Sequence, residues 1–302
     1  MTHLPPPLVW LNLDPKVILA FRHGKQGGPQ VVLNYARVSR EAWRLKALID
    51  IDERGHPVTS RFIVIRPKQR RLSLLAVWGL LNSPLANAYA FCRSGKRDVL
   101  AGDMGRMPVP DLAACDLAPL EEAVSEYLAV ARAMATQPQP TKRGAQQIKS
   151  ADQMPLFKGE AEATAIGPEA ERLKFLHWRV DAEVLRLYNL PAKLERRLLD
   201  LFGGIRRRGV PFLQTEYFPV GYTDLDRLSD LLAITVDWEK NNRRRSKLMD
   251  SEDEGRLTPA QAEELTNLQR LADALVGLIE PWKPDEVDRA VEWAKQRGVW
   301  KE

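Results

Sequence analysis

Cationic side chains gather at two places in the first third of the chain. The first group lies in and after a β-rich segment at residues 58–67, and the second occupies a short glycine-containing loop. We single out nine candidate nucleic-acid contacts: Arg61, Arg66, Lys68, Arg70, Arg71, Arg93, Ser94, Lys96 and Arg97. Lys and Arg neutralise backbone phosphates, and an Arg can also read a guanine edge. The alternative is a solubilising loop that binds nothing.

The charge of the chain is unevenly distributed along its length. Residues 1–110 contain 17 Lys and Arg against 7 Asp and Glu, whereas residues 111–302 contain 28 against 33. The net charge of +5 over 302 residues therefore hides a basic first third and a mildly acidic remainder. Such an asymmetry favours a polyanionic partner for the basic region. A solvated basic surface without a partner would give the same count.

Motifs that would support enzymatic chemistry are absent from the sequence. It has no glycine-rich phosphate loop and no G-x-S-x-G turn, and Cys92 lacks a nearby charge-relay pattern. The four histidines are scattered, without other metal ligands at suitable spacing. His177 lies on an apolar helix and is interpreted as structural. We therefore predict no active site, no metal and no cofactor.

Two further arginine triplets lie in the second half of the chain, at residues 206–208 and 243–245. The second triplet lies on a helix whose other side is apolar, so it is interpreted as a solvated helical face.

The order of elements predicts an α+β fold. Strands are expected at residues 29–39, 43–50 and 58–67, and the short turn at residues 52–55 predicts an antiparallel hairpin. Two helices should follow, separated at Asn82 and Ser83, because Ser83 and Pro84 form a good N-cap and first helical position. We predict a mixed α/β domain over residues 1–115, a connecting helix at 116–136, a flexible linker at 137–168 and a helical domain at 169–302.

Composition narrows the location of the protein. No apolar run approaches the length of a membrane span, and prolines interrupt the N-terminus where an export signal would be apolar. Two cysteines, Cys92 and Cys115, cannot build a disulfide scaffold. We expect a cytoplasmic protein with no membrane partner.

Three blocks of the chain resemble a known family. LLNSPLANAYAF, then SGKRDVLAGDMGRMPVPDL, resembles the end of a target-recognition domain, as found in type I restriction–modification specificity subunits and adenine-specific DNA methyltransferases. RVDAEVLRLYNLPAKLERRLLDLF resembles a segment that follows this domain in the methyltransferases. The matching positions of the first two blocks are Leu81, Asn82, Ser83, Met107, Pro108, Val109 and Pro110. The resemblance covers roughly residues 8–215.

The resemblance implies sequence-specific recognition of double-stranded DNA in restriction–modification or DNA methylation. The chain departs from the complete enzyme, because Asn82-Ser83-Pro84-Leu85 lacks the second proline and the aromatic of an Asn-Pro-Pro-Tyr motif. A flipped base needs such a stacking surface, and no glycine-rich S-adenosylmethionine loop is found. Catalysis is therefore expected from a separate methyltransferase polypeptide.

On this hypothesis the cations divide by role. Phosphate contacts are assigned to Arg66, Lys68, Arg70 and Arg71, and base or phosphate contacts to Arg93, Lys96 and Arg97. The alternatives are a degenerate methyltransferase fragment and a helical assembly protein without DNA contact. The assembly residues would be Trp238, Leu248, Leu265, Leu268 and Leu275.

Overall fold

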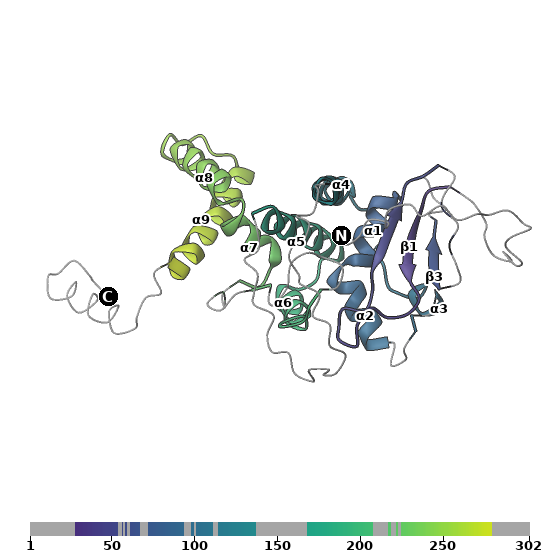
Figure 1. Cartoon of the computed structure of the whole chain (residues 1–302). Coiled ribbons are helices and arrows are strands. Elements are labelled where there is room, and N and C mark those ends of the chain that lie inside the picture. Colours follow the sequence, from purple (N-terminus) through teal and green to yellow (C-terminus); the bar gives the residue numbers. More distant parts are fainter. Residues whose placement is uncertain are drawn as a thin grey trace, which may run out of the picture. The chain divides into compact units, whose positions relative to one another are not determined.

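The computed structural model forms two compact units that divide between Tyr217 and Phe218, and each is considered by itself (Figure 1). The residues that it describes are 28–53, 56, 58, 61–66, 72–93, 98–99, 101–110, 114–136, 168–207, 217–218, 222 and 225–279. The first unit contains a small antiparallel sheet followed by helices, and the second is helical, which confirms the α+β class.

The sheet has three strands in the order β2-β1-β3. They are β1 (Gln30–Asn34), β2 (Ala47–Asp50) and β3 (Phe62–Ile65), and β1 runs antiparallel to both neighbours. The predicted hairpin between the second and third strands is wrong, because they lie on opposite edges of β1. A turn signal shows only that the chain reverses. Val31 and Leu33 of β1 are fully buried, which fits the central position of this strand in the sheet.

The break between the first two helices is confirmed. Helix α1 (Leu74–Asn82) ends before Ser83, and α2 (Pro84–Arg93) begins with proline in its first turn. The Ser83 hydroxyl accepts a hydrogen bond from the Ala86 amide at 3.2 Å, as an N-cap should. A short helix, α3 (Ala101–Met104), follows.

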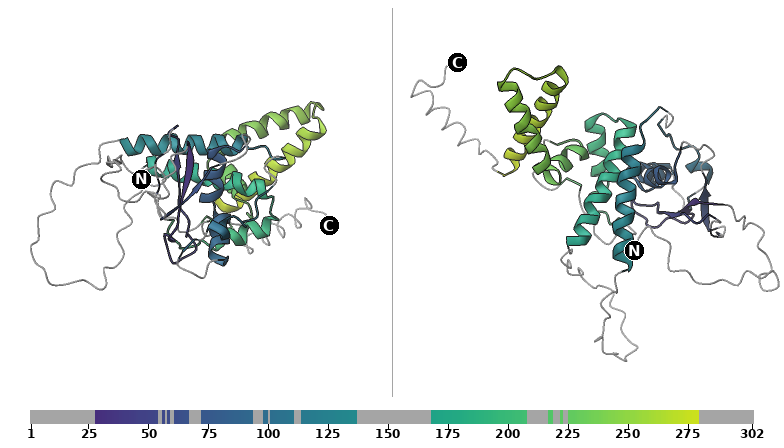
Figure 2. Two further views of the ribbon diagram at one scale, coloured as in Figure 1. Left: turned by 90° about the vertical axis from the view of Figure 1, so that its right-hand side faces the viewer. Right: turned by 90° about the horizontal axis from the view of Figure 1, so that it is seen from above.

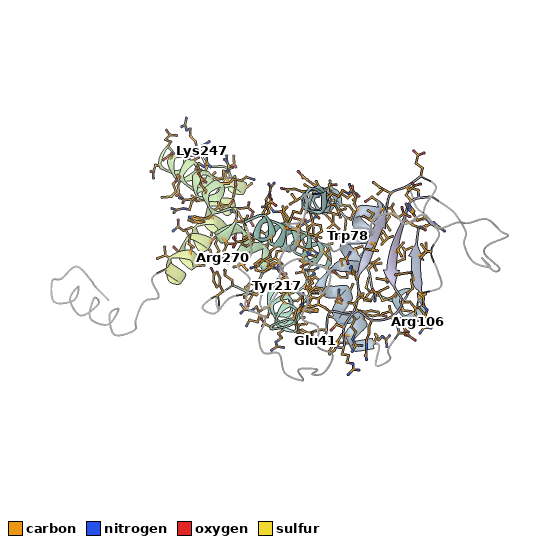
Figure 3. All side chains as sticks on the ribbon, viewed as in Figure 1. Glu41, Trp78, Arg106, Tyr217, Lys247 and Arg270 are labelled. Carbon is orange, nitrogen blue, oxygen red and sulfur yellow. The ribbon has the colours of Figure 1, made fainter. Side chains whose placement is uncertain are left out.

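Helix α1 is the central layer of the first unit. It packs on β1 and β2 with one side and on α4 (Ala118–Thr136) and α5 (Pro168–Tyr188) with the other. Figures 1 and 2 show the resulting order of sheet, α1 and the α4–α5 pair. The close approach requires a glycine, because a Cβ at Gly79 would lie 3.0 Å from Leu120 Cδ1. Trp78, labelled in Figure 3, is fully buried.

The division of the chain differs from the predicted one. Helices α4 and α5 pack together, although the expected linker at 137–168 separates them in the sequence. Residues 137–167 lie outside the described residues. Helices α5 and α6 (Ala192–Asp200) belong to the first unit, so the expected helical domain at 169–302 is divided between the two units.

The second unit is built on α7 (Leu228–Thr235), α8 (Trp238–Asp253) and α9 (Pro259–Ile279), which pack on one another. Thr258 and Gln261 form a capping box at the start of α9. The Thr258 amide donates to the Gln261 side-chain oxygen at 2.9 Å, and the Gln261 amide donates to the Thr258 hydroxyl at 3.3 Å.

Among the described helices, none has the length and apolarity that crossing a membrane requires.

A buried polar cluster joins distant parts of the first unit. We call it the polar hub; its members are Asn82, Asp181, Arg207 and Tyr217. The Arg207 guanidinium donates to both carboxylate oxygens of Asp181 and to the main-chain oxygen of Asn82. The Tyr217 hydroxyl donates to Asp181 at 2.7 Å. All four side chains are almost fully buried.

The polar hub is connected to the sheet through side chains at the α1–α2 junction. The Asn82 side-chain oxygen accepts from the Ala47 amide of β2 at 2.9 Å, and its nitrogen donates back to the Ala47 carbonyl. The Asn87 side-chain oxygen accepts from the amides of Arg44 and Leu45, both at 2.8 Å. These bonds fix β2 against the helices.

Arg207→Met should lower the free energy of unfolding by about 3–5 kcal/mol, because it leaves the Asp181 carboxyl group in the interior without its ion-pair partner, where burial raises the pKa of that group. Chemical denaturation followed by tryptophan fluorescence measures the loss, since the Arg207 guanidinium lies 4.2 Å over the Trp43 ring.

Arg207→Met combined with Asp181→Leu should cost less than the sum of the two single changes, because no buried charge is then left alone. Strictly additive losses would show that the two side chains are not energetically coupled.

Candidate nucleic-acid interface

One face of the sheet packs on α1, and most side chains of the opposite face remain at least partly accessible. We call this second surface the outer sheet face. Alternation along the strands places nine residues on it in three cross-strand rows. The rows are Lys46–Asn34–Phe62, Leu48–Val32–Val64 and Asp50–Gln30–Arg66.

The edge strand β3 is the most exposed part of the outer sheet face. Phe62 is 44% exposed and Val64 is 36% exposed, whereas Ile63 and Ile65 pack against the core. Arg61 precedes the strand and Arg66 follows it, and both are exposed. An aromatic and a β-branched side chain are thus presented between two guanidinium groups.

A hydrogen-bonded network orients Arg66. Its guanidinium donates to the Gln30 side-chain oxygen at 2.7 Å. Gln30 is fully buried, and its side-chain nitrogen donates to the Asp50 carboxylate at 3.0 Å and to the His56 carbonyl at 2.7 Å. These two bonds leave the amide oxygen of Gln30 facing Arg66. The guanidinium is therefore held in a defined direction.

Asp50 and His56 anchor the other end of this network. The His56 amide donates to Asp50 at 2.7 Å, and the imidazole Nδ1 lies 2.9 Å from the second carboxylate oxygen. Burial opposes ionisation of Asp50, but hydrogen bonds from His56 and Gln30 outweigh it and hold the pKa of Asp50 below its ordinary value.

The structure separates the predicted contact residues instead of gathering them in one pocket. Arg61 and Arg66 lie at opposite ends of β3, about 16 Å apart along an extended chain. Arg93 is exposed at the end of α2. The other six predicted contacts lie outside the described residues; they are Lys68, Arg70, Arg71, Ser94, Lys96 and Arg97.

The ends of the loop at 94–97 are nevertheless fixed. Arg93 ends α2, and Asp98 forms an antiparallel bridge with Ala36, two residues beyond β1. The Val99 amide also donates to the Tyr35 carbonyl at 2.6 Å. The chain leaving this loop therefore returns beside the sheet end that carries Asn34 and Phe62.

Two further cations of the sheet region were not among the predicted contacts. Lys46 lies on the outer sheet face, where burial lowers its pKa. Arg44, two residues before Lys46 in the chain, is 7% exposed, and its guanidinium stacks 4.7 Å from the Phe91 ring centroid.

The arginine triplet at residues 206–208 is not a uniform surface cluster. Arg206 is exposed, whereas Arg207 is 2% exposed within the polar hub. Burial alone would lower the pKa of Arg207, but the charge of Asp181, the nearby Tyr217 and the hydrogen bond to Asp181 together outweigh burial and raise it, so the guanidinium stays protonated. The sequence signal for this pair was Asp181, an acidic residue among the apolar positions of α5.

The positions that carry the family resemblance have structural contacts in this protein. Asn82 and Ser83 fix the α1–α2 junction, as described above. The Tyr188 hydroxyl of α5 donates to the Pro108 carbonyl at 2.9 Å, and burial raises the pKa of Tyr188 to about 12. The three resembling blocks therefore contact one another within one unit.

Among the described residues, His177 and the possible metal ligands form no catalytic or metal site. His177 is fully buried, with its ring centroid 4.6 Å from that of Tyr127 and 6.1 Å from that of Trp78. Within the described ranges, no group of three or more His, Cys, Asp or Glu side chains is arranged to hold a metal ion.

Comparisons with family models, with curated proteins and with solved structures found no match for this chain.

The hydrogen bond to Asp50 raises the pKa of His56 above its ordinary value of 6.5. While Asp50 remains ionised, the stabilisation that this pair contributes should be complete below about pH 6.5 and should be lost as the pH rises through the raised pKa of His56. Proton NMR of the His56 ring measures the pKa directly.

Asp50→Asn should return the His56 titration towards its ordinary pKa and remove this part of the pH dependence of unfolding. An unchanged His56 titration in that variant would contradict the assignment.

Proposed function

We propose that this chain recognises double-stranded DNA through the outer sheet face and the adjoining cations of the first unit. The single observation that carries the proposal is β3, which presents Phe62 and Val64 between the exposed Arg61 and Arg66. The excess of cations in residues 1–110 supports the same partner.

The chemistry of these side chains is suited to base edges. The major groove admits a two-stranded β-ribbon, and β1 with β3 forms such a pair. An arginine held in a fixed direction can donate two hydrogen bonds to guanine, and an apolar side chain can contact the methyl group of thymine. Arg66, oriented by Gln30, takes the first role. Phe62 and Val64 take the second.

We further propose that the protein is the recognition component of a cytoplasmic restriction–modification or DNA-methylation system, with a separate methyltransferase as its catalytic partner. This rests on the resemblance of the three sequence blocks. The contacts between those blocks support it, because Tyr188 of the third block bonds to Pro108 of the second.

A helical assembly function is the second candidate, and the structure changes the residues that would serve it. Leu248, Leu265 and Leu268 are buried within the second unit and are not accessible to a partner. Val236, Met249 and Val276 are 40–50% exposed and favour this candidate. A chain that binds a methyltransferase but no DNA under any salt condition would establish it.

Arg61→Gln with Arg66→Gln should weaken binding of the full chain to a duplex and should lower the slope of log K against log salt by about 0.9, because Arg61 loses one phosphate neutralisation while Arg66 loses a base contact. Fluorescence anisotropy with a labelled duplex at several salt concentrations measures both quantities. Lys193→Gln with Arg197→Gln, two exposed cations of α6, is the charge-matched control. Equal behaviour of the two double variants would overturn the assignment of β3.

Phe62→Ala tests base contact separately from charge. If the ring contacts a base edge, the change should weaken binding to a duplex selected for tight binding by up to about 3 kcal/mol, the free energy of burying a Phe side chain. The salt slope should not change, because an apolar contact releases no counterion. Binding to unrelated duplexes should change little. An equal loss for every duplex, or no loss for any, would show that Phe62 does not read sequence.

A further inference from the structure

Helix α8 packs on α7 and α9 but contributes almost no buried side chain to its unit. Of its 16 residues, only Leu248 is buried. A helix that buries so little apolar surface gains little from tertiary packing, so its stability depends on surface pairs or on a partner. Five of the eight residues from Lys240 to Lys247 are cationic.

The cations of α8 border an open depression of about 700 Å³. The residues that line it are Lys240, Asn241, Arg243, Arg244, Lys247 and Glu264. Lys240, Arg244 and Lys247 follow one another at spacings of four and three residues, so they share one face of the helix. The rise of a helix places the two lysines about 10 Å apart. Figure 3 labels Lys247 on α8.

Acidic side chains neutralise only part of this charge. Arg243 pairs with Glu239 at 2.9 Å. Arg244 donates two hydrogen bonds to Glu264 of α9, at 2.9 and 2.7 Å. Among the described residues, no ion pair involves Lys240 or Lys247. A surplus of positive charge therefore lines the depression.

We propose that this face of α8 binds the phosphodiester backbone of DNA, as a contact separate from the outer sheet face. The inference rests on the proposed function for the identity of the polyanion. A row of cations fixed on a helix matches a regularly spaced row of phosphates, and arginine offers a planar fork of donors that suits phosphate oxygens. The Arg244–Glu264 pair shows that this fork already engages an oxyanion in the depression. Because backbone phosphates carry no sequence information, this surface adds affinity without specificity.

Two substitutions with opposite expected effects test the proposal in the full chain. Lys240→Gln with Lys247→Gln should weaken duplex binding at least fivefold near 100 mM salt and lower the salt slope by about 1.8. Glu264→Gln should strengthen binding several-fold, because it removes the acidic side chain from the depression and releases Arg244. Both effects should be the same for a duplex selected for tight binding and for duplexes of unrelated sequence. Anisotropy of a labelled 20-base-pair duplex measures them, with thermal unfolding as a check of folding.

The Lys193→Gln with Arg197→Gln variant is again the control, since it removes the same charge from α6. Affinity and slope equal to those of the control would overturn the proposal, as would no effect of Glu264→Gln. Equal competition by a glutamate polymer would assign the surface to acidic peptides instead.

Failure of this proposal is distinguishable from failure of the proposed function. If only the variant with Lys240→Gln and Lys247→Gln loses binding, the result would support the α8 contact and would reject DNA contact by the outer sheet face. Loss only in the Arg61 and Arg66 variant would do the reverse.

Discussion

The ion pair between Arg207 and Asp181 is the interaction on which the first unit depends. Removing a guanidinium and a carboxylate from water is costly, and only close pairing with further hydrogen bonds offsets that cost. The carbonyl of Asn82 and the hydroxyl of Tyr217 supply those bonds. Because Asn82 also holds β2, the pair determines how the sheet sits against its helices and therefore what the outer sheet face presents.

Arginine side chains have three different environments in this protein. Arg207 is buried and neutralised by Asp181. Arg66 lies at the solvent boundary, where a buried Gln30 fixes its direction. Arg243 and Arg244 project from α8 beside glutamates in open solvent. Since the side chain is the same, its function depends on the dielectric environment and on the partner that the fold supplies.

These environments imply a division of work between the two proposed surfaces. The outer sheet face combines an oriented guanidinium with apolar side chains, which is the combination that distinguishes one base from another. The face of α8 offers charge on long side chains with little packing, which suits the uniform backbone of any duplex. Recognition and affinity would then be provided by separate parts of the same chain.

The sequence by itself determined where some helices begin and end, because caps are local: Ser83 separates α1 from α2, and Thr258 with Gln261 begins α9. The strands expected at residues 29–39, 43–50 and 58–67 are longer than β1, β2 and β3. The tertiary structure alone decided strand order, the packing of α4 on α5 across a long intervening segment, and the burial of Arg207. These features depend on contacts between residues far apart in the chain, and neither composition nor spacing encodes them. The candidate site depends on distant contacts for the same reason. The sequence showed the positive charge on either side of β3, but the direction of the Arg66 guanidinium is set by Gln30 of β1 and Asp50 of β2.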